Sequence, residues 1–149
     1  MRDATLFHYS GHAIRYRNEV ALVLSPDPDD PDELGRRGLY LLKASEHHPM
    51  PRMMTFSACS TGVYESTDTL LPGQLANTAL LAGAKIVVAS LWDVDSTATA
   101  SWMQAFYQVL RSGKDPTSAA AKANTVIQQH PGWSHPYYWA PFAIFEAGI

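Results

Sequence analysis

The chain alternates short apolar runs with segments of helical period, and this alternation limits its possible folds more than any other feature. The later segments repeat apolar residues at the three- and four-residue spacing of amphipathic helices. The strand-like runs lie at residues 4–9, 20–24, 38–42, 53–58, 86–91 and 137–145. This order predicts an α/β fold, with a mostly parallel sheet flanked by helices and joined by right-handed crossovers.

Two of these runs flank a polar segment. Residues 20–24 and 38–42 are predicted to pair as a hairpin. Between them, residues 26–33 hold three prolines and five acidic residues, so we interpret this stretch as a solvated loop. Calcium binding there is disfavoured, because the prolines break the regular ligand spacing of a calcium-binding loop.

Helix boundaries are marked locally in the second half of the chain. One helix is predicted over residues 71–82. The next is expected to be capped by Asp95 or Ser96 and to end at Gly113, which favours a helix stop. Another is predicted to start at Pro116, where the missing N–H of proline costs nothing.

Composition narrows the class of protein. A chain of 149 residues fits one domain, which we expect to span residues 1–149. The net charge of −3 gives no general attraction to nucleic acid, and no apolar run approaches the ~20 residues that span a bilayer. No signal-peptide core follows the N-terminus, and one cysteine excludes an internal disulfide. We therefore expect a cytoplasmic globular domain without nucleic-acid or membrane contact.

A histidine and a cysteine each follow a predicted strand. His12 comes just after residues 4–9, and Cys59 comes directly after residues 53–58. In parallel sheets, functional groups gather at the carboxyl ends of strands. The separation of 47 residues agrees with the roughly 50 residues between the histidine and cysteine of caspases.

This pair has the chemistry of a thiol nucleophile. A free thiol titrates near pH ~8.5, and an adjacent imidazole can lower that value and later protonate the leaving amine. Small residues surround both His12 and Cys59, and their backbone N–H groups could stabilise an oxyanion. The alternative interpretation is that Cys59 is a small buried hydrophobic residue without catalytic function.

Four segments, in this order along nearly the whole chain, resemble the CHAT family of caspase-like, separase-related domains, which are often fused to tetratricopeptide repeats. The family normally has additional strands and helices before the histidine strand, whereas this sequence starts almost at that strand. The resemblance therefore implies a caspase-like sheet lacking its N-terminal strands, completed by another chain or part of a longer domain. The segments are HYSGHA (residues 8–13), FSACSTG (56–62), LAGAKIVVASLWDVD (81–95) and HPYYWAPF (135–142).

The resemblance also assigns roles to residues. It implies a catalytic dyad of Cys59 and His12, with an oxyanion hole formed by the backbone N–H groups of Cys59 and Ala13. It further implies that an acid after residues 86–91 binds a basic side chain before the scissile bond, with Asp95 the first candidate and Asp93 the second. Capping of a helix alone would also explain an aspartate at position 95.

The resulting hypothesis is a cysteine endopeptidase that cleaves a protein partner, without cofactor or metal, alongside a repeat-containing sensor domain. The alternative is a catalytically silent caspase-fold interaction module. A flavodoxin-like signalling domain is disfavoured, because residues 10–13 contain no acid and no glycine-rich cradle. Trp92 and Trp139 either line substrate subsites or belong to the core, and His8 is interpreted as structural. The remaining histidines lack the spacing of zinc ligands.

Overall fold

The computed structural model describes residues 5–16, 19–24, 38–59 and 73–148, and the side chains of Tyr16, Ala58 and Cys59 lie outside this description. The predicted acidic loop at residues 26–33 also falls outside it. The strands are β1 (Leu6–Tyr16), β2 (Glu19–Val23), β3 (Gly38–Tyr40), β4 (Met53–Cys59), β5 (Ile86–Ser90) and β6 (Phe142–Glu146). The helices are α2 (Leu41–His47), α3 (Gln74–Leu81), α4 (Ser96–Arg111) and α5 (Pro116–Gln128), with a 3₁₀ turn, η1, at Pro136–Tyr138.

The strands form a mixed sheet in the order β3-β2-β1-β4-β5-β6. β4 pairs in parallel with both β1 and β5, whereas β2 pairs antiparallel with β1 and β3. The predicted hairpin is therefore confirmed as β2–β3. The predicted α/β class is also confirmed, and the architecture is consistent with a caspase-like fold.

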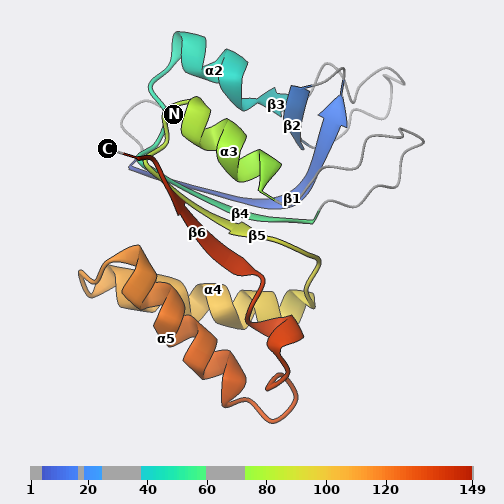
Figure 1. The fold of residues 1–149 in the computed structure, drawn as a ribbon, viewed down its shortest axis with the longest axis vertical. Helices are drawn as coiled ribbons and strands as arrows, with labels where there is room; N and C mark the ends of the chain where they lie inside the picture. The colour runs from blue at the N-terminus through green and yellow to red at the C-terminus, as the bar shows by residue number, and fades with distance from the viewer. Residues whose placement is uncertain (1–4, 17–18, 25–37, 60–72, 149) are drawn as a thin grey trace. The chain divides into compact units, whose positions relative to one another are not determined.

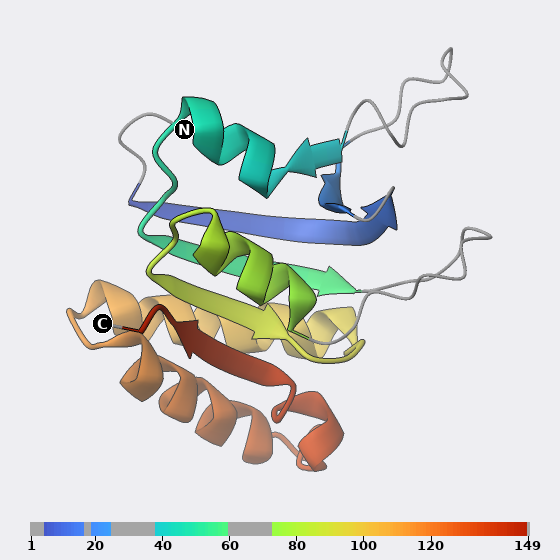
Figure 2. The same cartoon turned by 45° about the horizontal axis from the view of Figure 1, so that its top comes forward.

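The chain divides into two compact units. The first unit comprises residues 1–90 and 145–149. Its core is an apolar cluster in which side chains of β2, β4 and β5 meet buried residues of α2 and α3. Figures 1 and 2 show α2 and α3 side by side over one face of these strands. Met54 and Phe56 of β4 are almost completely buried in this cluster.

The second unit comprises residues 91–144 and is built around the antiparallel contact of α4 with α5. Trp102 stacks on Phe106 and on Phe142, with ring centroids 5.0 and 4.2 Å apart. The indole Nε1 of Trp102 donates to Oδ1 of Asn124 on α5 at 2.7 Å, so this fully buried tryptophan is satisfied as a donor. Figure 1 shows the two helices running alongside each other.

Three sequence predictions need correction. The first strand, predicted to end at residue 9, runs on through residues 10–12 to Tyr16 as β1. Residues 41–42, predicted as strand, begin α2, whose Leu41 is fully buried. The final strand starts only at Phe142, because residues 136–138 form η1. In the first two cases pairing with β4 and the burial of Leu41 override the local propensity.

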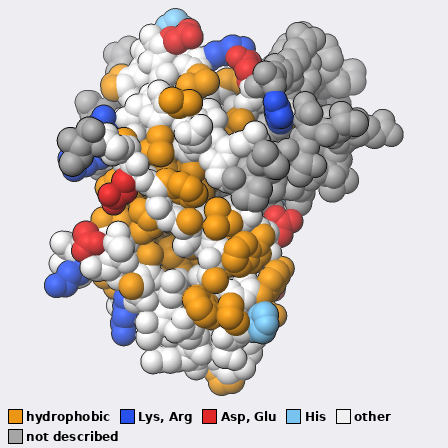
Figure 3. Space-filling model, viewed as in Figure 1, with side chains coloured by type: hydrophobic (Ala, Val, Ile, Leu, Met, Phe, Trp, Pro, Cys, Tyr) orange, Lys and Arg blue, Asp and Glu red, His pale blue; other side chains and the backbone are white. Residues whose placement is uncertain are grey.

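Several large hydrophobic side chains remain exposed. Leu81 of the first unit is 70% exposed, and Tyr137 of the second is 45% exposed. Figure 3 shows hydrophobic side chains as orange areas between polar and charged ones on the face in view. Within the described ranges, no helix has both the length and the apolar character needed to cross a bilayer.

Candidate active site

Strand β1 changes its partner strand partway along its length. Its first part pairs in parallel with β4, from Leu6 opposite Met53 to His12 opposite Cys59. Its last part pairs antiparallel with β2, beginning with Ala13 opposite Leu22. His12 therefore lies inside a long strand, at the point where one ladder ends and the other begins.

The backbones of His12 and Cys59 are register partners. They form the last pair of the β1–β4 ladder, and Cys59 is also the last residue of β4. The backbones of the two residues predicted as a dyad from the sequence are thus paired at the end of the parallel β1–β4 ladder, where β4 ends and β1 continues. Their catalytic roles stay a prediction.

The tyrosine three residues before His12 contacts the same backbone. The Tyr9 hydroxyl lies 2.8 Å from the His12 carbonyl oxygen and 2.5 Å from the Val23 carbonyl oxygen on β2. Burial raises the pKa of this hydroxyl, so it is protonated and donates at neutral pH. Sequence reasoning missed Tyr9, because its contact with Val23 on β2 joins residues far apart along the chain.

Strand alternation separates the two faces of β1 near the site. Phe7 and Tyr9 are half-buried and pack against the core of the first unit, whereas His8, Ser10 and His12 are exposed. Partial burial nevertheless lowers the pKa of His8, which favours its neutral form. His8 and Tyr9 therefore lie on opposite faces of β1, as strand geometry requires.

The predicted oxyanion donors are the backbone N–H groups of Ala13 and Cys59. Ala13 is 3% exposed and belongs to the core cluster, so its side chain is anchored while its backbone adjoins that of His12. This neighbourhood is compatible with an oxyanion hole beside the register pair. The donor roles stay predictions.

Asp95 caps helix α4. Its Oδ1 accepts hydrogen bonds from the backbone N–H groups of Thr97 at 3.0 Å and Ala98 at 2.9 Å. Asp93 is exposed in the segment between β5 and α4. Both acids belong to the second unit and the dyad belongs to the first, and the predicted role of the acids in a substrate pocket stays a prediction.

The two tryptophans singled out in the sequence are held by backbone carbonyls. Trp92 Nε1 donates to the carbonyl of Tyr137 at 3.1 Å, and Trp139 Nε1 donates to that of Ser134 at the same distance. Trp92 is 39% exposed and Trp139 is half-buried. Neither is a fully buried core residue, and each is fixed by its indole hydrogen bond.

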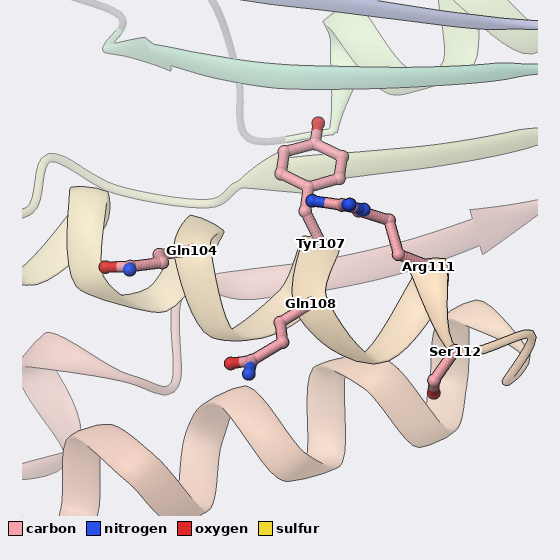
Figure 4. A pocket seen from close by; sticks show the side chains of 5 residues that line it. All are labelled: Gln104, Tyr107, Gln108, Arg111 and Ser112. Atoms are coloured by element: carbon pink, nitrogen blue, oxygen red, sulfur yellow. The ribbon is translucent and has the colours of Figure 1, made fainter.

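Two further features of the described residues bear on metal and ligand binding. No group of three His, Cys, Asp or Glu side chains gathers among these residues as it would around a metal ion. An open hollow of about 680 Å³ lies along α4 and is lined by Gln104, Tyr107, Gln108, Arg111 and Ser112. Figure 4 shows Tyr107 and Arg111 extending together on one side of the helix. None of these lining residues is an acid or a cysteine. Ser112, which follows α4 as its C-cap, carries the one aliphatic hydroxyl among them.

The mixed sheet, with a histidine and a cysteine in register at the end of a parallel ladder, is compatible with the caspase-like class of domain. The chain belongs to the CHAT domain family, a caspase-like family whose model matches residues 1–147. The predicted family is thereby confirmed.

Two curated proteins show partial similarity. Tetratricopeptide repeat protein 28 from Homo sapiens is 36% identical over 70 residues, and its counterpart from Mus musculus is 33% identical over 70 residues. Each match covers 47% of this chain and only 3% of the relative. The chain therefore corresponds to a small part of these large proteins.

Proposed function

We propose that this domain is a cysteine endopeptidase that uses Cys59 as nucleophile and His12 as general base and acid. The observation that carries the proposal is the register of the two residues at the end of the β1–β4 ladder. Neighbouring strands lie about 4.8 Å apart, so side chains leaving such a pair by the same face come within reach of one another. Membership of the CHAT family supports the same assignment.

The chemistry follows from a thiol beside an imidazole. The imidazole takes the thiol proton, and the thiolate attacks the carbonyl carbon of the scissile amide. The oxyanion that forms would be stabilised by the backbone N–H groups of Cys59 and Ala13. The imidazolium then gives its proton to the leaving amine, and water hydrolyses the thioester. No metal or cofactor is needed for these steps.

We infer that the enzyme cleaves a protein partner after a basic residue. Asp95 remains the first candidate for binding that side chain and Asp93 the second. A carboxylate can form two parallel hydrogen bonds with a guanidinium, which explains the expected preference for arginine. Because Oδ1 of Asp95 already accepts two backbone hydrogen bonds, its carboxylate would be held in a fixed orientation.

The partner we propose is a module containing tetratricopeptide repeats, on the same chain or another, which controls the peptidase. The two similar curated proteins are named for such repeats. Because the protein has one cysteine, we expect the thiol to act in a reducing compartment such as the cytoplasm.

The single cysteine allows a direct test of the dyad. Alkylation by iodoacetamide can occur at only one thiol, so its rate as a function of pH reports the ionisation of Cys59. We expect the wild type to react with an apparent pKa well below ~8.5, and His12→Ala to restore a value near ~8.5. Cys59→Ser provides the unlabelled control. Identical profiles for the wild type and His12→Ala would refute the dyad.

Peptide cleavage then separates an enzyme from a silent interaction module. The second possibility is favoured by the names of the curated relatives, which record repeats and not peptidase activity. Fluorogenic peptides ending in Arg, Lys or Asp should be cleaved by the wild type, with Arg and Lys preferred, and not by Cys59→Ser or His12→Ala. If the domain binds a tetratricopeptide-repeat protein and the pKa of its Cys59 thiol is unperturbed, the result would support the silent interaction module instead of the enzyme.

A further inference from the structure

We propose that Tyr9 is a positioning residue for His12, because its hydroxyl fixes the backbone that carries the imidazole. The inference rests on the proposed function, since positioning has meaning only if His12 acts on Cys59. Tyr9 itself contacts no reacting atom in this assignment. It acts through the main chain of His12, at the junction of the two ladders of β1.

The β1–β2 ladder ends next to His12. Its last pair toward the site is Ala13 opposite Leu22. In the same register, His12 and Val23 come next and lie just beyond this last pair of the ladder. The Tyr9 hydroxyl lies between the strands, within hydrogen-bonding distance of both carbonyl oxygens. A side chain thus links the two strands at the position of His12.

Gly11, between Tyr9 and His12, leaves room for the tyrosine ring. A Cβ atom at Gly11 would lie 2.6 Å from the Tyr9 hydroxyl oxygen and 2.8 Å from Cζ of the ring. Real Cβ atoms do not approach other atoms so closely, so the ring can cross the strand here only because residue 11 is glycine. The Tyr9 hydroxyl and Gly11 therefore act together to fix the backbone conformation that leads to His12.

The backbone of His12 is held by two sets of contacts. His12 is held on one side by the β1–β4 ladder, where it is opposite Cys59. On the other side its carbonyl is held by the half-buried Tyr9 side chain, which also reaches β2. A hydroxyl has one proton, so the two carbonyls share it, and its removal leaves both without this donor. The His12 backbone would then be free to shift, and an imidazole displaced by a fraction of an ångström stabilises the thiolate less.

The test is the pH profile of Cys59 alkylation in Tyr9→Phe, which removes the hydroxyl and keeps the ring. We expect an apparent thiol pKa between those of the wild type and His12→Ala, and a rate at pH 6.5 about three- to tenfold below the wild type. In a His12→Ala background, Tyr9→Phe should cause no further change, because it acts through the imidazole. Tyr137→Phe, at an exposed tyrosine of the second unit, is the matched control and should overlap the wild type.

Gly11→Ala provides an independent variant, since it keeps the hydroxyl and displaces the ring. It should raise the thiol pKa in the same direction as Tyr9→Phe. If Tyr9→Phe and Gly11→Ala both follow the wild-type profile while His12→Ala does not, positioning is wrong and the dyad stands. If His12→Ala also follows the wild type, the proposed function fails and this inference fails with it. A loss of thermal stability in Tyr9→Phe with an unchanged profile shows a structural role only and also overturns the inference.

Discussion

Replacement of Asp95 by alanine should destabilise the second unit by removing the cap of α4. The carboxylate accepts hydrogen bonds from the backbone N–H groups of Thr97 and Ala98, which have no intrahelical partner at this end of the helix. The helix that follows carries Trp102 and Phe106 into the apolar core. Fraying of its first turn therefore weakens packing that the whole unit depends on.

The size of the effect follows from measured N-caps. Removal of an aspartate cap costs about 1 kcal/mol of unfolding free energy, with a range of about 0.5–2. For a chain of about 150 residues this corresponds to a fall in melting temperature of about 2–4 °C. Asp95→Asn keeps an acceptor oxygen and loses only the charge near the helix N-terminus, so its cost should be a few tenths of a kcal/mol. Asp93→Ala should change stability by less than about 0.5 kcal/mol, since Asp93 is exposed.

The assay is thermal and urea unfolding at pH 7, followed by circular dichroism. The expected order of stability is wild type, Asp95→Asn, then Asp95→Ala, with Asp93→Ala near the wild type. An Asp95→Ala variant that melts with the wild type would refute the capping argument. A fall in Asp95→Asn as large as in Asp95→Ala would show that the charge, not the hydrogen bonds, carries the stabilisation.

The same variants separate capping from substrate recognition. Because Asp95→Asn should fold normally, a selective loss of cleavage of Arg peptides in this variant would assign the charge of Asp95 to the substrate pocket. A selective loss in Asp93→Asn instead would exchange the two candidates. Equal cleavage by both variants and the wild type would exclude both acids from the specificity proposed here.

Two further predictions concern single buried or capping groups. Asp115 accepts hydrogen bonds from the side chain and backbone N–H of Ser118, which lower the pKa of its carboxyl group. Its stabilising effect is therefore present at neutral pH and is lost as the pH falls through the lowered pKa, so Asp115→Ala should be less stable than the wild type in urea at pH 7 and approach it once the pH falls below that lowered pKa. Thr55 is fully buried, and its hydroxyl has no hydrogen-bond partner in the described part of the chain. Thr55→Val should raise the unfolding free energy by about 1 kcal/mol in urea titrations, and a decrease would show that the hydroxyl has a partner after all.

The second half of the chain was predictable from the sequence because its signals are local. Asp95 and Asp115 occupy N-cap positions, and Pro116 opens α5 as expected. Gly113 follows α4 with a φ of 84°, which favours glycine. Each of these signals acts within one turn of helix, so no knowledge of distant residues is needed to interpret it.

The extent of β1 and the presence of α2 were not predictable in this way. Ser10 and Gly11 favour a turn by propensity, yet pairing with β4 keeps both in a strand. Leu41 and Leu42 favour a strand, yet Leu41 is buried as the first residue of a short helix. Both outcomes are decided by contacts with residues far away in the sequence, which propensity does not contain.

The candidate site was predictable in its residues but not in its geometry. The sequence placed His12 and Cys59 near strand ends, and the structure adds that the two are register partners. It also adds the contact of Tyr9 with Val23, which joins residues 14 positions apart on different strands. The Tyr9 hydroxyl lies where the β1–β2 ladder ends and the β1–β4 ladder begins. No local sequence pattern predicts such a contact.

The packing of the sheet itself restricts this register. Phe7 and Tyr9 of β1 face the core, and their register partners Met54 and Phe56 belong to the same buried cluster. A slip of one residue would bring core-facing residues of one strand opposite residues of the other face, because side chains alternate along a strand. The apolar faces of β1 and β4 therefore exclude every odd-numbered slip.

A slip of two residues keeps the faces and must be opposed by specific contacts. The rings of Phe7 and Phe56 meet edge to face with centroids 6.4 Å apart, and the slip that places Phe7 opposite Arg52 would separate them. It would also place His12 opposite Ser57 instead of Cys59, whereas the opposite slip would place His12 beyond the end of β4. The aromatic contact that stabilises the sheet thus also opposes the slip that would place His12 opposite Ser57. Replacing Phe56 by leucine should for this reason lower the rate of Cys59 alkylation. The loss of rate should exceed the loss expected from the fraction of unfolded protein alone.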